Sequence, residues 1–490
     1  MNGIGSALMQ AAGRAGVILA TEPCDRSFLS RYLALREAAV MPLLDAPAST
    51  FMGRIKNRIQ QVSLAPMERM RDRMLAEMRR ALLVEAESAS RPAGLPGLVY
   101  VAPFDVLSRN GGAARVLGLA RAFGARYHVS VLSVVGPNRS PEIIPVAPGV
   151  RIIAIPQTPA FLQAVEADRR VFRGAAASLG LDRHARHLPL LDYWYRRLAE
   201  SAAISVLNQP YLVGLWRRYP GTARKLYDVP EVNSFFTVRM AGPDADEAAV
   251  RAEQQRLEAE VLGMADAVGM CSKRDVDALA EVFGEAVRAK VRLVANGIHV
   301  EEQPFFPPGR ARILAGACGW GKPLAIFLGS PAYPPNLEAV RFIAEALAPA
   351  FPDAVFALIG MNKAETRLST IPPNVVACGR VGDADKTALL ALADVALSPI
   401  HSYDSGSSLK IADYLAHGKP VLASEHGWRG YEALGDVASP LANEAYVGAL
   451  NNVWDRIATD PAACDTAAAS ARERLSAHYD WSVIAHAYGG

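Results

Sequence analysis

The stretch from residue 398 to 424, SPIHSYDSGSSLKIADYLAHGKPVLAS, constrains the fold more than any other part of the chain. The apolar run 395–400 has the composition of a buried parallel strand, and Val421 begins a second such run. Between the two runs, a polar loop leads into a helix that Ser407 or Ser408 can cap and that Gly418 can end. Two parallel strands joined through a helix predict an α/β fold with helices covering the sheet.

The polar loop and the first turn of the helix suit an anionic ligand. A helix N-terminus offers unpaired backbone N–H groups and the positive end of the helix dipole. Lys410 lies in the first turn and can add a full charge, while Asp413, one turn further, can accept hydrogen bonds from sugar hydroxyls. The alternative interpretation is an ordinary strand–helix–strand unit with a capped helix.

The segment 404–421, DSGSSLKIADYLAHGKPV, resembles the donor-site signature of the family-4 glycosyltransferases, also called glycosyl transferases group 1. These are retaining enzymes of the GT-B fold, so the resemblance implies two doubly wound, Rossmann-like domains facing a cleft. It implies that Lys410 contacts the donor diphosphate and that Asp413 binds the ribose. The residues that it places around the phosphates and the sugar are Gly406, Ser407, Ser408 and Leu409.

Two positions depart from the family pattern. Many members have two glutamates in an E-x7-E arrangement; the first falls on Ser405, beside Asp404, and the second is replaced by Asp413. The resemblance therefore makes Lys410, Ser405 and Asp404 the candidate catalytic residues.

Other candidate donor-binding residues come from loops after strands. Gly112 lies in the first strand-to-helix loop, which faces the donor phosphates in the resembled family; a simple tight turn is the alternative. The phrase FLGSPAYPPNLEAV contains Ser330 and Asn336, and we expect Asn336 to cap the next helix. Arg380 and Val381 match the family segment whose backbone holds the nucleotide base. Because the loop 328–336 has no basic residue, Lys410 is expected to bear more of the phosphate charge alone.

On the acceptor side, Asp228 ends a predicted strand and resembles the family's strand-end aspartate near the acceptor. His184 and His187 leave three alternatives open: they face an acceptor sugar, contact an anionic lipid carrier, or lie on a solvated helix surface.

Strand–helix alternation divides the chain into four predicted parts. A Pro-rich connector, QPFFPPG at 303–309, separates two strand–helix series. We expect a helical extension at 1–95, an acceptor domain at 96–302 and a donor-binding domain at 303–478. The last part, 479–490, resembles the family's terminal helix, which returns to the N-terminal domain.

Composition excludes several other classes of protein. A net charge of +3 over 490 residues gives no reason to expect a nucleic-acid partner. The five cysteines have no metal-ligand spacing, and the D-x-D pairs at 244–246 and 383–385 precede predicted helices, where aspartate is a normal cap. We therefore expect no metal and no cofactor. The sequence has no convincing signal peptide and no apolar run long enough to span a membrane, which predicts a cytoplasmic protein.

The segment 54–80 reads as a basic amphipathic helix. Such a helix can lie on an anionic membrane surface, or it can pack its Met and Leu side chains on the next domain. The first alternative predicts peripheral contact with the inner membrane face.

Together these features predict a metal-independent, hexosyltransferase-type enzyme that moves a sugar, with retention, from a nucleotide-diphosphate sugar to a hydroxyl acceptor. The acceptor is expected to be a glycan or a lipid-linked sugar in envelope or exopolysaccharide synthesis. The alternatives are a catalytically weak GT-B scaffold that binds a nucleotide or a glycan, and a sugar-nucleotide epimerase of the same fold.

Overall fold

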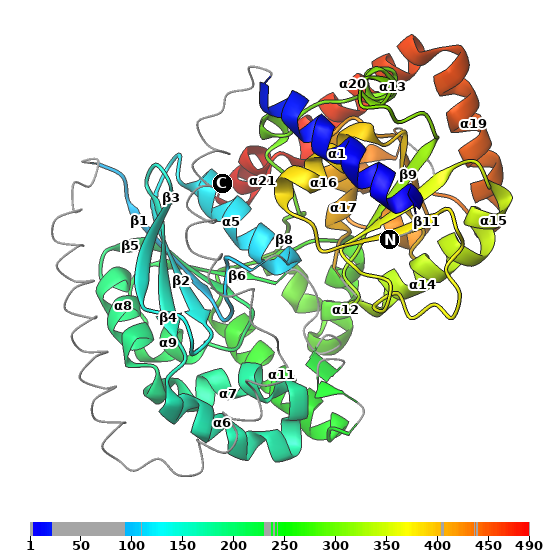
Figure 1. Ribbon diagram of the computed structural model, residues 1–490. Coiled ribbons are helices and arrows are strands. Elements are labelled where there is room, and N and C mark those ends of the chain that lie inside the picture. Colours follow the sequence, from blue (N-terminus) through cyan, green and yellow to red (C-terminus); the bar gives the residue numbers. More distant parts are fainter. Residues whose placement is uncertain are drawn as a thin grey trace.

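The computed structural model describes residues 3–21, 94–108, 110–229, 237–238, 241–242, 244–402, 406–435, 437 and 440–489 (Figure 1). The described chain forms two α/β domains, each built on its own sheet. The α-helices of the described chain are α1 (Gly3–Thr21), α5 (Gly111–Phe123), α6 (Pro159–Phe172), α7 (Ala176–His184), α8 (Pro189–Ala199), α9 (Gly214–Arg218), α11 (Glu247–Met264), α12 (Lys273–Phe283), α13 (Pro308–Ala317), α14 (Pro334–Phe342), α15 (Ala348–Ala350), α16 (Asp383–Leu392), α17 (Leu409–Ala416), α18 (Glu425–Trp428), α19 (Tyr446–Thr459), α20 (Pro461–Tyr479) and α21 (Trp481–Gly489).

The N-terminal sheet has the strand order β3-β4-β2-β1-β5-β6-β7-β8. Its strands are β1 (Gly97–Ala102), β2 (His128–Val135), β3 (Glu142–Ala147), β4 (Val150–Pro156), β5 (Ala202–Asn208), β6 (Arg224–Asp228), β7 (Ala267–Met270) and β8 (Val291–Leu293). All neighbours are parallel except β3, which pairs with β4 in the antiparallel sense. The sequence did not predict β3, since Pro145 interrupts a short, partly exposed run that only an edge strand tolerates.

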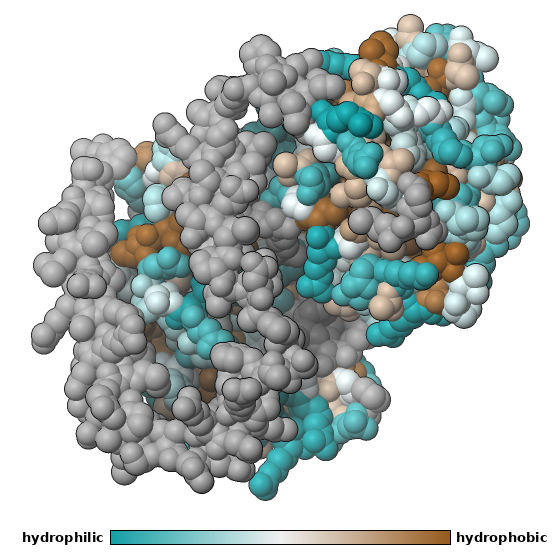
Figure 2. All heavy atoms as spheres, viewed as in Figure 1, coloured by the Kyte–Doolittle hydropathy of each residue, from teal (hydrophilic) through white to brown (hydrophobic). Residues whose placement is uncertain are grey.

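The C-terminal sheet has the order β11-β10-β9-β12-β13 and is parallel throughout. Its strands are β9 (Leu324–Leu328), β10 (Val355–Ile359), β11 (Val375–Gly379), β12 (Val395–Ser398) and β13 (Val421–Ala423). Helices cover both faces, so the strands are almost continuously apolar. Figure 2 shows hydrophilic and hydrophobic residues interspersed over the visible face of this domain, the face on which α1 lies in Figure 1.

The helix at the end of the described chain, α21, lies against α5 of the N-terminal domain (Figure 1). Trp481, Ile484 and Tyr488 recur on one face of α21 and are buried. A side chain at Gly118 of α5 would place its Cβ 2.1 Å from the Trp481 ring, so this close packing requires glycine.

The first helix, α1, is part of the C-terminal domain rather than of a separate extension. It packs against α16 and β11, and its apolar face, Leu8, Ala11, Ala12 and Ala15, joins the core of that domain. The predicted boundary at residue 95 would therefore assign α1, a helix of the C-terminal core, to a separate extension. The basic segment 54–80 lies outside the described residues.

Candidate functional site

The helix α17 begins at the edge of the C-terminal sheet that faces the N-terminal domain. Ser408 occupies its N-cap position without a side-chain cap bond, and the helix ends before Gly418, which has a left-handed φ of 77° as predicted. This geometry leaves the first turn of α17, with Lys410, at the junction between the domains.

The Lys410 ammonium is held by neutral groups. Its Nζ donates to Asn336 Oδ1 at 2.9 Å and lies 4.3 Å from the centre of the Phe327 ring. Asn336 is itself fixed, because its Nδ2 donates to the backbone oxygen of Ser330 at 2.9 Å. Ser330 and Asn336 thus position Lys410, although Asn336 is not a helix cap: α14 begins at Pro334, with Tyr333 at the cap position.

No carboxylate is paired with Lys410 among the described residues of the structure. Burial, and then the nearby charge of Arg429, lower the pKa of the Lys410 ammonium to about 7. A half-buried cation that lacks an anionic partner is stabilised when an anion binds beside it.

The second cation of the site, Arg429, was missed by the sequence analysis. It follows α18, and its guanidinium donates to Tyr333 Oη at 3.1 Å and to the His426 carbonyl at 2.6 Å. The Ser408 N–H donates to the Arg429 carbonyl at 3.3 Å, which ties the two segments together. No local motif marks Arg429, because the fold brings it beside Lys410 from the segment that follows β13 and α18.

The loop before α17 is bound to the N-terminal domain. Gly406 adopts a left-handed φ of 79°, and its N–H donates to Asp275 Oδ1 at 3.0 Å. Ser407 Oγ accepts from Asn296 Nδ2 at 2.7 Å. Leu409 approaches the start of α5 so closely that a Cβ at Gly111 would lie 2.7 Å from its Cδ1. The predicted candidates Asp404 and Ser405 lie outside the described residues.

The predicted Gly112 lies in the first turn of α5, where it faces the Phe104 ring. Asn110 caps this helix, because its side chain accepts from the Ala113 N–H at 2.9 Å. The neighbouring Gly111, and not Gly112, makes the close approach to the loop before α17.

Asp413, the predicted ribose-binding residue, is paired with Lys386, whose Nζ donates to both carboxylate oxygens at 3.1 and 3.0 Å. Burial by itself would raise the pKa of the Asp413 carboxyl, but the charge and hydrogen bonds of Lys386, together with the nearby His417, outweigh it and hold that pKa below its ordinary value. Asp413 is thus an ionised carboxylate at the site, but it shares its oxygens with a cation.

The predicted base-binding residues lie after β11. The Arg380 side chain is 74% exposed and lies 3.8 Å from Glu365. Val381 packs against the core of the C-terminal domain. Gly379, just before them, has a left-handed φ of 75°, which turns the chain at the end of β11.

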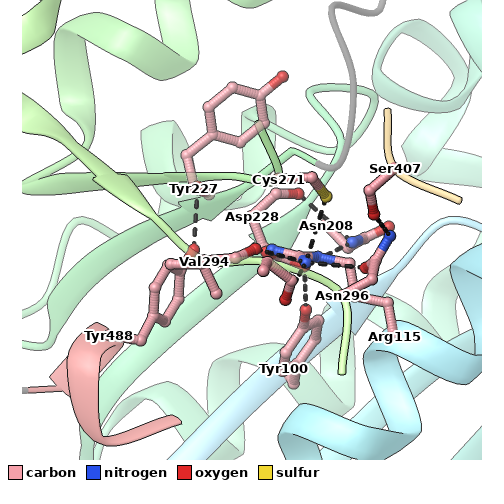
Figure 3. Close-up of polar contacts among 11 residues, drawn as sticks. Tyr100, Arg115, Asn208, Tyr227, Asp228, Cys271, Val294, Asn296, Ser407 and Tyr488 are labelled. Carbon is pink, nitrogen blue, oxygen red and sulfur yellow. Dashed lines mark hydrogen bonds and ion pairs between the residues drawn. The ribbon is translucent and has the colours of Figure 1, made fainter. Parts of the chain in front are cut away.

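Asp228 does not face an acceptor, and this prediction is corrected. It is fully buried and paired with Arg115, whose Nη2 donates to Oδ1 at 2.6 Å (Figure 3). Tyr100 Oη and Asn208 Nδ2 donate to Oδ2 at 2.5 and 2.9 Å. Burial and then the Asp228 charge raise the pKa of Tyr100 well above its ordinary value, so the phenol stays protonated. The Asp228 carboxylate is therefore the buried counter-ion of Arg115 inside the N-terminal domain.

The two predicted acceptor-side histidines are engaged locally. His184 Nε2 lies 2.9 Å from Asp168 Oδ2, and Arg186 donates to His187 Nε2 at 3.2 Å. The His187 carbonyl accepts from Thr158 Oγ1 at 2.7 Å. These contacts hold the pair among α6, α7 and the start of α8, and no described contact joins either side chain to α17.

A pocket of about 310 Å³ lies between the domains, where the first turn of α12 meets the segment that follows β13. Trp428 and Tyr431 line it, together with the charged or ionisable side chains of Lys273, Arg274, Glu425, His426, Arg429 and Glu432. Because Arg429 lines this pocket and also acts on Lys410, the pocket adjoins the site at α17.

In the part of the chain that the structure describes, no group of three or more His, Cys, Asp or Glu side chains is arranged to hold a metal ion. Asp246 caps α11, since its carboxylate accepts from the Ala249 N–H at 3.0 Å, and Asp383 begins α16.

Among the described helices, none combines the length and the apolarity that crossing a bilayer requires.

Comparisons with known proteins agree with this architecture. Residues 322–454, which contain α17, Asn336 and Arg429, match the family model of the glycosyl transferases group 1. A curated glycogen synthase from Mycobacterium tuberculosis is 26% identical over 275 residues, which is 54% of this chain and 63% of the relative. The aligned region therefore spans less than two thirds of that relative's length.

Solved structures resemble the whole two-domain unit. A sucrose-phosphate synthase from Thermosynechococcus elongatus superposes with a TM-score of 0.55 at 19% identity, over 80% of this chain and 96% of that one. A trehalose 6-phosphate synthase from Burkholderia multivorans gives a TM-score of 0.51 at 14% identity, over 80% of this chain and 97% of that one. These likenesses confirm the predicted GT-B fold.

Proposed function

We propose that this chain, whose residues 322–454 carry the glycosyl transferases group 1 domain, is a glycosyltransferase that uses a nucleotide-diphosphate sugar as its donor. The observation that carries the proposal is the half-buried Lys410 ammonium, which has Arg429 beside it and no carboxylate partner among the described residues. A donor diphosphate supplies the negative charge that this arrangement lacks.

The chemistry requires positive potential at the leaving group. When the bond from the anomeric carbon to the diphosphate breaks, the electron pair goes to the diphosphate oxygen, where charge develops. Lys410, Arg429 and the first turn of α17 stabilise that charge without a metal ion. The acceptor hydroxyl oxygen forms the new bond to the anomeric carbon, and its proton passes to the departing diphosphate oxygen, which becomes basic as the bond breaks. Retention at this carbon is part of the proposal and is supported by the resemblance of 404–421 to a retaining family.

The two domains enclose the reaction. Contacts from Asp275 and Asn296 to the loop before α17 join the domains on one side of the site. A site closed in this way keeps water from the donor, which limits hydrolysis. We propose the pocket between α12 and the 425–440 segment as the acceptor site, because it adjoins the cations that would hold the donor.

The acceptor is proposed to be a hydroxyl of a glycan or a lipid-linked sugar. The names of the relatives, a glycogen synthase and two synthases of phosphorylated disaccharides, favour a saccharide acceptor. A hexosyl donor, a role in envelope or exopolysaccharide synthesis, a cytoplasmic location and peripheral membrane contact through 54–80 remain hypotheses from the sequence.

A second candidate function is a catalytically weak GT-B protein that binds a nucleotide or a glycan. Its support is that both predicted carboxylates, Asp413 and Asp228, have basic partners within the protein. Such a protein would bind the nucleotide without turning over the sugar.

The test is donor turnover by the purified protein. A panel of nucleotide-diphosphate sugars is incubated with saccharide acceptors, release of the nucleoside diphosphate is measured, and NMR reports the anomeric configuration of the product. We expect acceptor-dependent release with retention. Tight nucleotide binding without release would favour the second candidate, and neither binding nor release would contradict both.

A further inference from the structure

Asn296, which follows β8, contacts both domains with one side chain. It is 5% exposed. Its Oδ1 accepts from Arg115 Nη1 of the N-terminal domain at 2.9 Å, and its Nδ2 donates to Ser407 Oγ of the C-terminal domain at 2.7 Å (Figure 3). Its backbone oxygen accepts from Tyr431 Oη at 3.2 Å. Asn296 is therefore a bridge between the buried Arg115 and the loop before α17.

The orientation of the Asn296 amide follows from its partners. A guanidinium can only donate hydrogen bonds, so the amide atom facing Arg115 must be the oxygen. Arg115 is itself immobile: it is fully buried, its Nε and Nη2 hold Asp228, and its Nη1 also donates to the Val294 carbonyl at 2.8 Å. The amide nitrogen must consequently face Ser407.

This orientation determines what the Ser407 hydroxyl can do. Its oxygen accepts a hydrogen bond from Asn296 Nδ2, so its own single O–H remains available to donate another. The Cys271 thiol is another polar group beside this hydroxyl, and burial raises the pKa of that thiol to about 12. A neutral thiol is a weak acceptor, so an anionic oxygen would compete with it easily for the proton.

We propose that Asn296 is a positioning residue that presents the Ser407 hydroxyl proton to a phosphate oxygen of the nucleotide-diphosphate donor. The inference rests on the proposed function and adds to it a residue of the other domain. Because Asn296 belongs to the N-terminal domain and Ser407 to the donor-binding domain, the diphosphate is held best when the two domains are in contact.

A double-mutant cycle tests the inference. The variants are Asn296→Ala, Ser407→Ala and their combination, and the probes are UDP, ADP and GDP, each compared with its nucleoside by calorimetric titration. We expect Asn296→Ala to weaken diphosphate binding about 10-fold, the size of one lost charge-assisted hydrogen bond, and to leave nucleoside binding unchanged. Since Asn296 acts through Ser407, the double variant should bind like Ser407→Ala alone.

Two further variants separate positioning from folding. Asn296→Asp keeps the shape and the acceptor for Arg115, but its carboxylate accepts the Ser407 O–H hydrogen bond, so the variant should lose diphosphate affinity while remaining folded. Asn374 is the matched control: it is equally buried and donates to the Ala348, Phe351 and Ala354 carbonyls. Asn374→Ala should lower the melting temperature and leave the preference for diphosphate over nucleoside unchanged.

The outcomes distinguish the inference from the proposed function. Wild-type diphosphate affinity in folded Asn296→Ala and Asn296→Asp, or independent, additive losses in the cycle, would overturn the inference alone. If the wild-type protein binds none of the three diphosphates, the proposed function is wrong and the inference falls with it.

Discussion

At the scale of single residues, Lys410 gives the site a pH dependence. Its pKa of about 7 in the free protein means that the amine is mostly neutral at pH 8. A bound diphosphate favours the charged form and raises this pKa, so binding at pH 8 should take up about one proton. Calorimetric titrations in buffers of different ionisation enthalpy measure this uptake. It should be lost in Lys410→Met, and an unchanged uptake in that variant would assign the proton to another group.

The same residue should affect stability in a definite direction. The pKa of Lys410 is about 7 in the folded protein and near its ordinary value of about 10.4 in the unfolded chain. Between these values the unfolded chain binds more protons, so this lysine's destabilising effect is full below pH 7 and fades as the pH rises towards 10. Without ligand, the melting temperature of the wild type relative to Lys410→Met should therefore rise from pH 7 to pH 10. A constant difference would contradict a half-buried ammonium that has no carboxylate partner among the described residues.

At the scale of elements, the packing of α21 on α5 depends on one glycine. A Cβ at Gly118 would overlap the rigid Trp481 ring, so Gly118→Ala should destabilise the protein by about 1–3 kcal/mol. Gly316 in α13 is the matched control, because a Cβ there meets nothing within 4 Å. Gly316→Ala should instead be neutral or stabilise by up to about 1 kcal/mol. Denaturant unfolding of both variants measures the change in the free energy of unfolding. Equal changes in the two variants would mean that Trp481 of α21 does not pack against Gly118.

The helix α1 makes a second prediction at this scale. Leu8 is fully buried in the C-terminal core, whereas Gln10, on the same helix, is exposed. Leu8→Ala should cost about 2–5 kcal/mol, while Gln10→Ala should change little. A chain that begins at Gly94 should likewise melt at a lower temperature than the whole chain. If its melting temperature is unchanged, α1 contributes nothing to the core.

At the scale of the whole molecule, the sequence predicted the two parallel-sheet domains because buried strands and their helices leave local, periodic patterns. It predicted Lys410 and the 406–409 loop because both lie in one contiguous motif. The edge strand β3 was missed, since a short strand containing Pro145 lacks that pattern.

Contacts between distant segments could not be predicted in this way. Arg115 lies 113 positions from Asp228, and Arg429 lies 19 positions beyond Lys410, after β13 and α18. Nothing local distinguishes these arginines from others. The assignment of Asp228 to the acceptor failed for this reason: the strand end was placed correctly, but its counter-ion comes from α5.

The central claim is that Lys410 stabilises the departing diphosphate, and steady-state turnover of Lys410→Ala with the identified donor tests it most directly. Loss of such a transition-state contact is worth about 2.7–4 kcal/mol, so kcat should fall roughly 100- to 1000-fold in a folded protein. Asp413→Ala, one turn along the same helix, should mainly raise KM for the donor, because the ribose contact predicted for Asp413 is the same in the ground and transition states. A kcat for folded Lys410→Ala equal to that of the wild type would contradict the account.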